Sequence, residues 1–346
     1  MHMADALISP IVGGTMLAAS TGVAAYSIKK VQKDLDEKKV PFMGVMGAFV
    51  FSAQMINFSI PATGSSGHLG GGMLLAIMLG PYAGFLSMAS ILLIQALFFG
   101  DGGLLAYGCN VWNLGFYTCF LAYPLFLWVT KKGFSSKRIF WGAMVSSLIA
   151  LQLGAFSVVL ETLFSGKTEL PFGVFVLLMQ PIHLAIGVVE GLVTALITTF
   201  VWKARPEVLE QTVSGDPIGS LSIKRILMVI LVAAVLVGGS LSWFASENPD
   251  GLEWSMEKTS GSTELETEGE IYQVFSRIQD KIVIMPDYGF SSINELDTKS
   301  KGIISNERIG TSVSGILGGF LTLILIISIG FSIHIFKKKK RIGLKK

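Results

Sequence analysis

The chain has 346 residues, of which 51% are hydrophobic and only 15% are charged, with a mean hydropathy of +0.62 and a formal net charge of +3. Soluble domains contain roughly 25% charged residues, so this composition excludes an ordinary soluble protein and predicts a membrane protein. The two cysteines, Cys109 and Cys119, both lie inside apolar stretches, which argues against a disulfide framework.

Apolar stretches long enough to cross a membrane follow one another along the chain. A spanning helix needs about 20 mainly apolar residues. The stretch 69–99 is uncharged but is interrupted by Gly80-Pro81, so it forms either one long helix or a hairpin of two. The other predicted spans are 11–28, 41–60, 104–129, 139–164, 172–202, 226–245 and 310–336.

The distribution of basic residues favours the hairpin. If the chain turns back at Gly80-Pro81, 20 of the 27 Lys and Arg residues lie on one side, in the runs 29–39, 131–138, 203–225 and 337–346. The side rich in Lys and Arg is the cytoplasm. We therefore predict an all-α, polytopic helix bundle in the cell membrane, with about nine transmembrane helices, an outer N-terminus and a cytoplasmic C-terminus.

Two parts are predicted within this bundle. Residues 1–204 hold seven of the helices, residues 205–225 form a cytoplasmic linker, and residues 226–346 hold two helices that flank an extracytoplasmic segment, 246–307. That segment carries 13 acidic and 5 basic residues, a net charge of −8. It is either a solvated spacer or a surface that attracts cations. No basic residue precedes the first apolar stretch, so no signal peptide is predicted and Met1 is expected to remain.

The histidines at the predicted outer side are candidate metal ligands. A free terminal amine, the backbone nitrogen of residue 2 and the imidazole of His2 can surround one metal ion, and His68 could supply a fourth nitrogen. Such a nitrogen set suits Ni(II) or Cu(II), whereas carboxylate and water sites suit Mg or Ca. His68 lies in the glycine-rich loop ATGSSGHLGGG, where it could equally be a turn residue.

A second candidate pair lies at depth in the membrane. His183 precedes Glu190 by seven residues, which puts both on nearly the same face of one helix. Ionisable groups inside a membrane are rare, and a functional role is the default hypothesis for them. A hydrogen bond that packs two helices together explains the pair equally well.

Enzyme motifs are not found in the sequence. It contains no HExxH or GxSxG motif, and Gly166-Lys167-Thr168 lacks the earlier glycine of a phosphate-binding loop because Glu161 stands there. We expect a transport protein and no enzyme. A self-sufficient metal channel or secondary transporter that uses His183 and Glu190 is the alternative to a binding subunit.

Four segments together resemble a known family: MHMADALISP at 1–10, SSGHLGGG at 65–72, FFGDGGLLAYGCNVWNLG at 98–115 and HLAIGVVEGLVTALI at 183–197. They resemble the substrate-capturing M component of nickel and cobalt energy-coupling factor transporters. NPDGLEWS at 248–255 and MPDYGF at 285–290 resemble the small N component, here fused to the M component. The opening MHMADAL departs from the cobalt-type opening MHIPDGF, which favours nickel.

The resemblance implies that residues 1–204 capture Ni(II) or Co(II) as the substrate near the outer face, without an organic cofactor. The implied ligands are the amino group of Met1, the amide and imidazole nitrogens of His2, and the imidazole of His68. The implied partners are a transmembrane coupling subunit and cytoplasmic ATPase subunits, with no nucleic acid. Three polar residues are candidates for orienting the ligands, or for joining helices as polar contacts: Ser66, Asn110 and Asn113.

Overall fold

The computed structural model describes residues 2–34, 39–215, 223–265, 269–290 and 303–343. The fold is all-α, as predicted, apart from one small hairpin of two strands. The helices are α1 (Pro10–Asp34), α2 (Lys39–Gln54), α3 (Gly72–Leu79), α4 (Pro81–Ile94), α5 (Tyr107–Val111), α6 (Tyr123–Thr130), α7 (Ser136–Phe164), α8 (Phe172–Ala204), α9 (Pro206–Ser214), α10 (Lys224–Gly239), α11 (Gly251–Ser260), α12 (Glu270–Ile282) and α13 (Ile303–Gly343).

Six helical segments within the described residues are long and apolar enough to cross a membrane: Pro10–Lys33, Pro81–Phe99, Tyr107–Thr130, Ser136–Phe164, Phe172–Ala204 and Ile309–Ile335. Two of them continue through π-helical stretches, Gln95–Phe99 after α4 and Trp112–Ala122 between α5 and α6. The apolar helices α2 and α10 have 16 residues each, and α3 has 8. Together these segments agree with the prediction of about nine.

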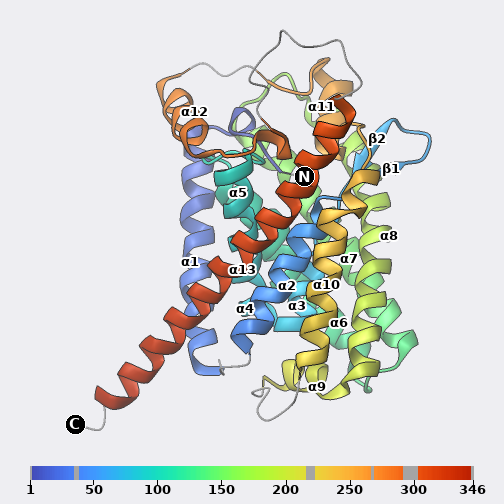
Figure 1. Ribbon diagram of the computed structural model, residues 1–346. Coiled ribbons are helices and arrows are strands. Elements are labelled where there is room, and N and C mark those ends of the chain that lie inside the picture. Colours follow the sequence, from blue (N-terminus) through green and yellow to red (C-terminus); the bar gives the residue numbers. More distant parts are fainter. Residues whose placement is uncertain (1, 35–38, 216–222, 266–268, 291–302, 344–346) are drawn as a thin grey trace.

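The predicted turn at Gly80-Pro81 is confirmed. Gly80 ends α3 with a φ of 81°, a conformation that glycine adopts without strain, and Pro81 starts α4. The turn returns the chain to the end of the bundle where α3 began. The C-terminal ends of α1, α6, α8 and α13 therefore lie at one end, which we call the basic end (Figure 1). We call the opposite end, which carries residues 2–9, 55–71, 100–106, 245–265 and 269–290, the loop end.

The predicted span 41–60 is too long, because α2 ends at Gln54. The chain then forms a hairpin of β1 (Phe58–Ile60) and β2 (Ser65–Gly67), in which Ser59 pairs with Ser66. This hairpin leads into the short helix α3. The amides just before α3 find their acceptor on α8. Gly70 and Gly71 donate their N–H groups to the Glu190 carboxylate at 2.7 and 3.2 Å. Buried irregular backbone within a membrane protein requires such partners.

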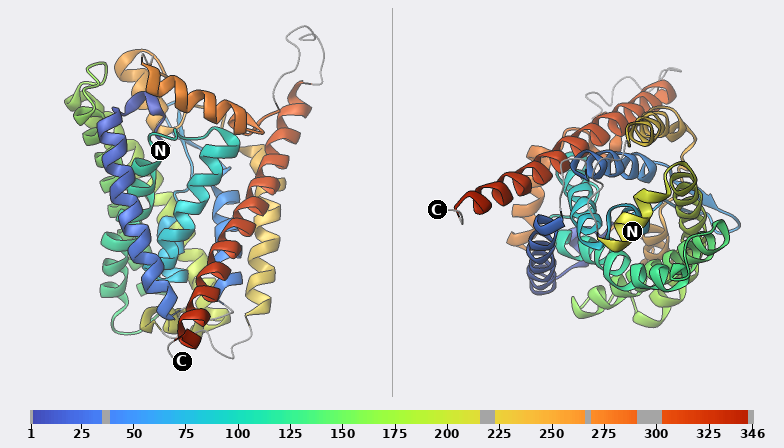
Figure 2. Two further views of the ribbon diagram at one scale, coloured as in Figure 1. Left: turned by 90° about the vertical axis from the view of Figure 1, so that its left-hand side faces the viewer. Right: turned by 90° about the horizontal axis from the view of Figure 1, so that it is seen from below.

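The C-terminal part packs onto the first part as one bundle. Helices α10 and α13 both contact α2, and they contact each other where a Cβ on Gly315 would lie 2.5 Å from the Gly238 carbonyl oxygen. The predicted linker contains the helix α9, whose Thr212 hydroxyl donates to the Met78 carbonyl at 3.1 Å. Helix α13 crosses the bundle obliquely to the basic end (Figure 1), while α12 lies across the loop end (Figure 2).

Candidate metal centre

The first described residues enter the bundle at the loop end and are held by main-chain contacts. Asn110 on α5 accepts the Met3 N–H at 2.8 Å and donates to the Met3 carbonyl at 3.1 Å. Gly103 also donates its N–H to that carbonyl, at 2.9 Å. A side chain at Gly103 would overlap the Asp5 carboxylate, so a glycine is needed where the loop 100–106 packs against residues 3–5. The position of residue 2 is therefore closely determined.

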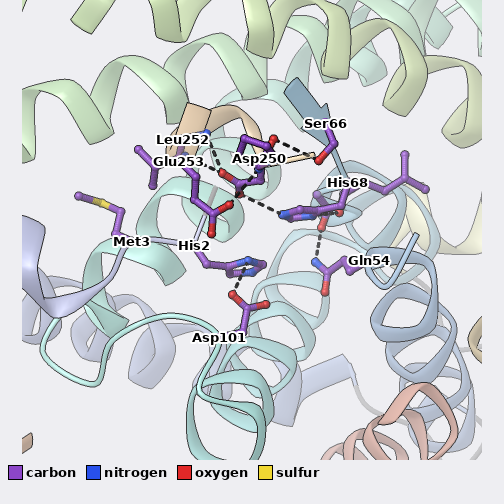
Figure 3. Close-up of polar contacts among 12 residues, drawn as sticks. His2, Met3, Gln54, Ser66, His68, Asp101, Asp250, Leu252 and Glu253 are labelled. Carbon is purple, nitrogen blue, oxygen red and sulfur yellow. Dashed lines mark hydrogen bonds and ion pairs between the residues drawn. The ribbon is translucent and has the colours of Figure 1, made fainter. Parts of the chain in front are cut away.

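His2 and His68 are brought together at this place. Their rings stack with centroids 5.0 Å apart and an interplanar angle of 8° (Figure 3). The two side chains are only 5% and 10% exposed. Burial lowers the pKa of each imidazole to about 3, so both rings are neutral near pH 7 and carry a lone pair that can bind a metal. Met1, the third predicted ligand, lies outside the described residues.

Two carboxylates lie beside the two imidazoles (Figure 3). Asp101 Oδ1 is 3.2 Å from His2 Nδ1, and the Tyr288 hydroxyl donates to Asp101 Oδ2 at 2.5 Å. Burial raises the pKa of Asp101, against the effect of the Tyr288 hydrogen bond. Asp250 Oδ2 lies 4.0 Å from His68 Nε2. Both histidines therefore face a carboxylate.

Asp250 is anchored as the N-cap of α11. Its Oδ1 accepts the N–H groups of Leu252 and Glu253 at 2.8 and 2.9 Å, and Glu253 Oε2 accepts the Asp250 N–H at 3.0 Å, which completes a capping box. Although burial by itself opposes ionisation, the charge of the amino terminus and the Glu253 amide hold the pKa of Asp250 below its usual value. The carboxylate is therefore a fixed negative charge.

The three residues predicted to orient the metal ligands make hydrogen bonds to backbone groups or to the carboxylate of Glu161. Ser66 Oγ donates to the Asn248 carbonyl at 2.8 Å, and Asn110 holds Met3 as described above. Asn113 Nδ2 donates to Glu161 Oε2 at 2.8 Å and approaches Met3 Sδ at 3.7 Å. Their role in orienting the ligands remains a prediction. The contacts of Asn110 indicate that it positions His2 through the backbone.

His183 and Glu190 occupy different environments. His183 Nδ1 donates to the Met179 carbonyl at 2.8 Å, while its buried Nε2 has no hydrogen-bond partner within the described ranges. That ring lines a cavity of about 10 Å³, shared with His68 and Asp250, which has room for about one water molecule. The Glu190 carboxylate accepts hydrogen bonds from the two amides that precede α3.

Sequence reasoning missed Asp101, Tyr288 and Asp250 as neighbours of the histidines. A local signal existed for Asp250, because an Asp followed three residues later by Glu is typical of a capping box at a helix start. Nothing local linked it to His68. In the part of the chain that the structure describes, no three His, Cys, Asp or Glu side chains form a ready metal site.

Comparison with known proteins identifies the family of both parts of the chain. Residues 2–208 match the family model of the cobalt uptake substrate-specific transmembrane region, CbiM, and residues 224–335 match the PDGLE domain. A putative fused nickel transport protein NikMN of Archaeoglobus fulgidus is 30% identical, over 96% of this chain and 98% of the relative. A probable fused nickel transport protein LarMN of Lactiplantibacillus plantarum is 32% identical, over 61% and 67%.

A solved structure shares the first part of the fold. The crystal structure of a truncated transition metal transporter is 33% identical, with a TM-score of 0.52, over 59% of this chain and 99% of that one. The matches are to transport proteins, not enzymes. Since one family model covers more than half of the chain and the archaeal relative aligns over nearly all of it, the chain belongs to the nickel and cobalt transport family in which an M component is fused to an N component.

Proposed function

We propose that this chain is the substrate-binding subunit of an ATP-driven importer, and that it captures Ni(II), or Co(II), at the loop end of the bundle. The ligands are the amino group of Met1, the amide nitrogen and Nδ1 of His2, and Nε2 of His68. The observation that carries the proposal is the buried pair of neutral imidazoles beside the first residues of the chain. The fused relatives described as nickel transport proteins favour nickel.

Metal capture in this arrangement requires the His2 ring to turn. Only Nδ1 is close enough to the backbone nitrogen of the same residue for both to bind one ion, and in the structure Nδ1 faces Asp101 Oδ1 at 3.2 Å. The stacked rings also have to leave their parallel arrangement, because ligand lone pairs lie in the ring planes. The ion therefore replaces Asp101 as the partner of His2 Nδ1. His68 already directs Nδ1 to the Leu69 carbonyl at 3.0 Å, so Nε2 is the nitrogen of this ring that would bind the ion.

Energy for transport comes from separate ATPase subunits, coupled through a transmembrane partner. Nickel uptake by cells is therefore expected to fall to background when this chain is expressed without those subunits, and to recover when they are co-expressed. Uptake of radioactive Ni(II) measures this directly, with His68→Ala in the full set of subunits as the control for the site. Equal uptake by the chain alone would support a self-sufficient channel or secondary transporter instead.

In the proposed orientation the loop end faces outward and the basic end faces the cytoplasm, because Lys and Arg gather on the cytoplasmic side. Ser135 caps α7 at the basic end, and Ser262 follows α11 at the loop end. In a variant without Cys109 and Cys119, a cysteine at position 262 is expected to react with an impermeant maleimide in intact cells, and one at position 135 only after lysis. Reaction of both in intact cells would contradict the orientation.

A further inference from the structure

The start of α11 belongs to the C-terminal part but is bound to the hairpin that carries His68. The Ser66 N–H donates to the Pro249 carbonyl at 2.8 Å, and the Trp254 indole N–H donates to the Thr63 carbonyl at 3.0 Å. Together with the bond from Ser66 Oγ to Asn248, these contacts join the two segments on both sides of Asp250. The carboxylate of Asp250 therefore keeps a constant position relative to His68.

The two oxygens of Asp250 face different groups. Oδ1 accepts the amides of α11, and Oδ2 lies 4.0 Å from His68 Nε2. Because the Nδ1 of His68 is directed to the Leu69 carbonyl, the Nε2 lone pair points away from the backbone. Metal–nitrogen bonds are about 2.0–2.1 Å long. An ion on Nε2 would therefore lie close to this carboxylate.

The short distance between Asp250 and the proposed ion matters because the ion is charged. The terminal amine and the two imidazoles bind as neutral ligands, and the amide nitrogen of His2 binds after releasing its proton to solvent. A doubly charged ion with one anionic ligand would therefore still bring a net positive charge into the site. Such a charge is costly unless a counter-ion or fixed dipoles compensate it. Asp250 is partly buried, with its side chain 17% exposed, and it is anchored by two amides and close to the ligand nitrogen. It also borders the cavity shared with His68.

We propose that Asp250 is the countercharge of the captured ion: a positioning residue from the C-terminal part that faces His68 and tightens metal binding without joining the nitrogen ligands. This inference rests on the proposed function. It assigns the C-terminal part a direct role in metal affinity. The loss of a carboxylate or other group that supports a metal ligand typically weakens affinity about 10- to 100-fold.

The chain offers variants that separate charge from folding. Asn and Ser cap helices about as well as Asp, so Asp250→Asn and Asp250→Ser keep the start of α11 while removing the charge. Glu253→Gln is the matched control, because it removes a charge from the same capping box and keeps an oxygen that can accept the residue 250 N–H. His68→Ala tests the proposed site itself.

The test uses the full-length protein with a tag after Lys346, titrated with Ni(II) in a calorimeter. Absorption spectra are recorded at saturation, and the Tm is measured without metal. Both Asp250 variants are expected to raise Kd about 10- to 100-fold with an unchanged Ni(II) spectrum and nearly unchanged Tm, while Glu253→Gln leaves Kd unchanged.

Four outcomes would overturn the inference. An unchanged Kd in both Asp250 variants would show that Asp250 is not the countercharge of the ion. A changed Ni(II) spectrum would show that Asp250 is a ligand instead. An equal rise of Kd in Glu253→Gln would show that a disturbed start of α11, and not the lost charge of Asp250, weakens binding. Unfolding of both Asp250 variants would show that the Asp250 carboxylate is needed for folding. If His68→Ala binds Ni(II) as tightly as the wild type, the proposed function fails as well; if it loses binding while the Asp250 variants do not, only this inference fails.

Discussion

Extending the chain ahead of Met1 is expected to abolish high-affinity Ni(II) binding, whereas a tag after Lys346 leaves it intact. An extension converts the terminal amine into an amide and removes one nitrogen of the proposed chelate. The first described residues are held firmly, since Met3 is fully buried and bound by Asn110. The expected loss exceeds about 100-fold in Kd, because loss of a group that only supports a ligand already costs about 10- to 100-fold.

The measurement is isothermal titration with Ni(II) on purified protein carrying the tag at either end. His2→Ala is the matched variant, because it removes the imidazole and keeps the amine, and it is expected to lose binding as well. The Tm of each metal-free protein shows whether the fold is retained. If the extended protein binds Ni(II) with the affinity of the wild type, the ion is held elsewhere, and His183, with its unpartnered buried Nε2, is the next residue to test.

Replacing Glu190 by Ala is expected to cause the largest loss of stability among the polar residues discussed here. Its carboxylate accepts the N–H groups of Gly70 and Gly71, and the side chain is buried. Each buried amide left without a partner costs about 1–3 kcal/mol, so the free energy of unfolding is expected to fall by about 2–6 kcal/mol. Thermal unfolding in detergent, followed by circular dichroism, measures the loss.

Glu190→Gln separates this structural role from a transport relay. Gln keeps one acceptor oxygen, so its loss of stability is expected to lie between those of the wild type and the Ala variant, and nickel uptake per folded molecule is expected to remain. If Glu190→Gln is as stable as the wild type but transports no nickel, Glu190 takes part in a pathway through the membrane, and the channel interpretation is favoured over the binding subunit.

The sequence by itself predicted the class of fold and much of its topology. Membrane spans and their orientation can be read from short stretches of sequence, because each span is determined by its own apolar residues and by the Lys and Arg residues beside it. They predicted the turn at Gly80-Pro81, which the structure contains. The resemblance of short motifs predicted the family, which the comparisons show. It also singled out His2 and His68, whose rings the structure brings together.

Only the tertiary structure decided which groups surround those histidines. Asp250 is far from His68 in the sequence, and it reaches the ring because the backbone of 248–249 binds the hairpin of Ser66. Tyr288 is also far from Asp101 in the sequence, and its hydroxyl donates a hydrogen bond to the Asp101 carboxylate. The sequence left Glu190 either as part of a relay or as a contact that packs two helices, and the structure shows its carboxylate accepting the amides before α3. These contacts depend on burial and on how distant segments pack, which no local pattern of residue types encodes.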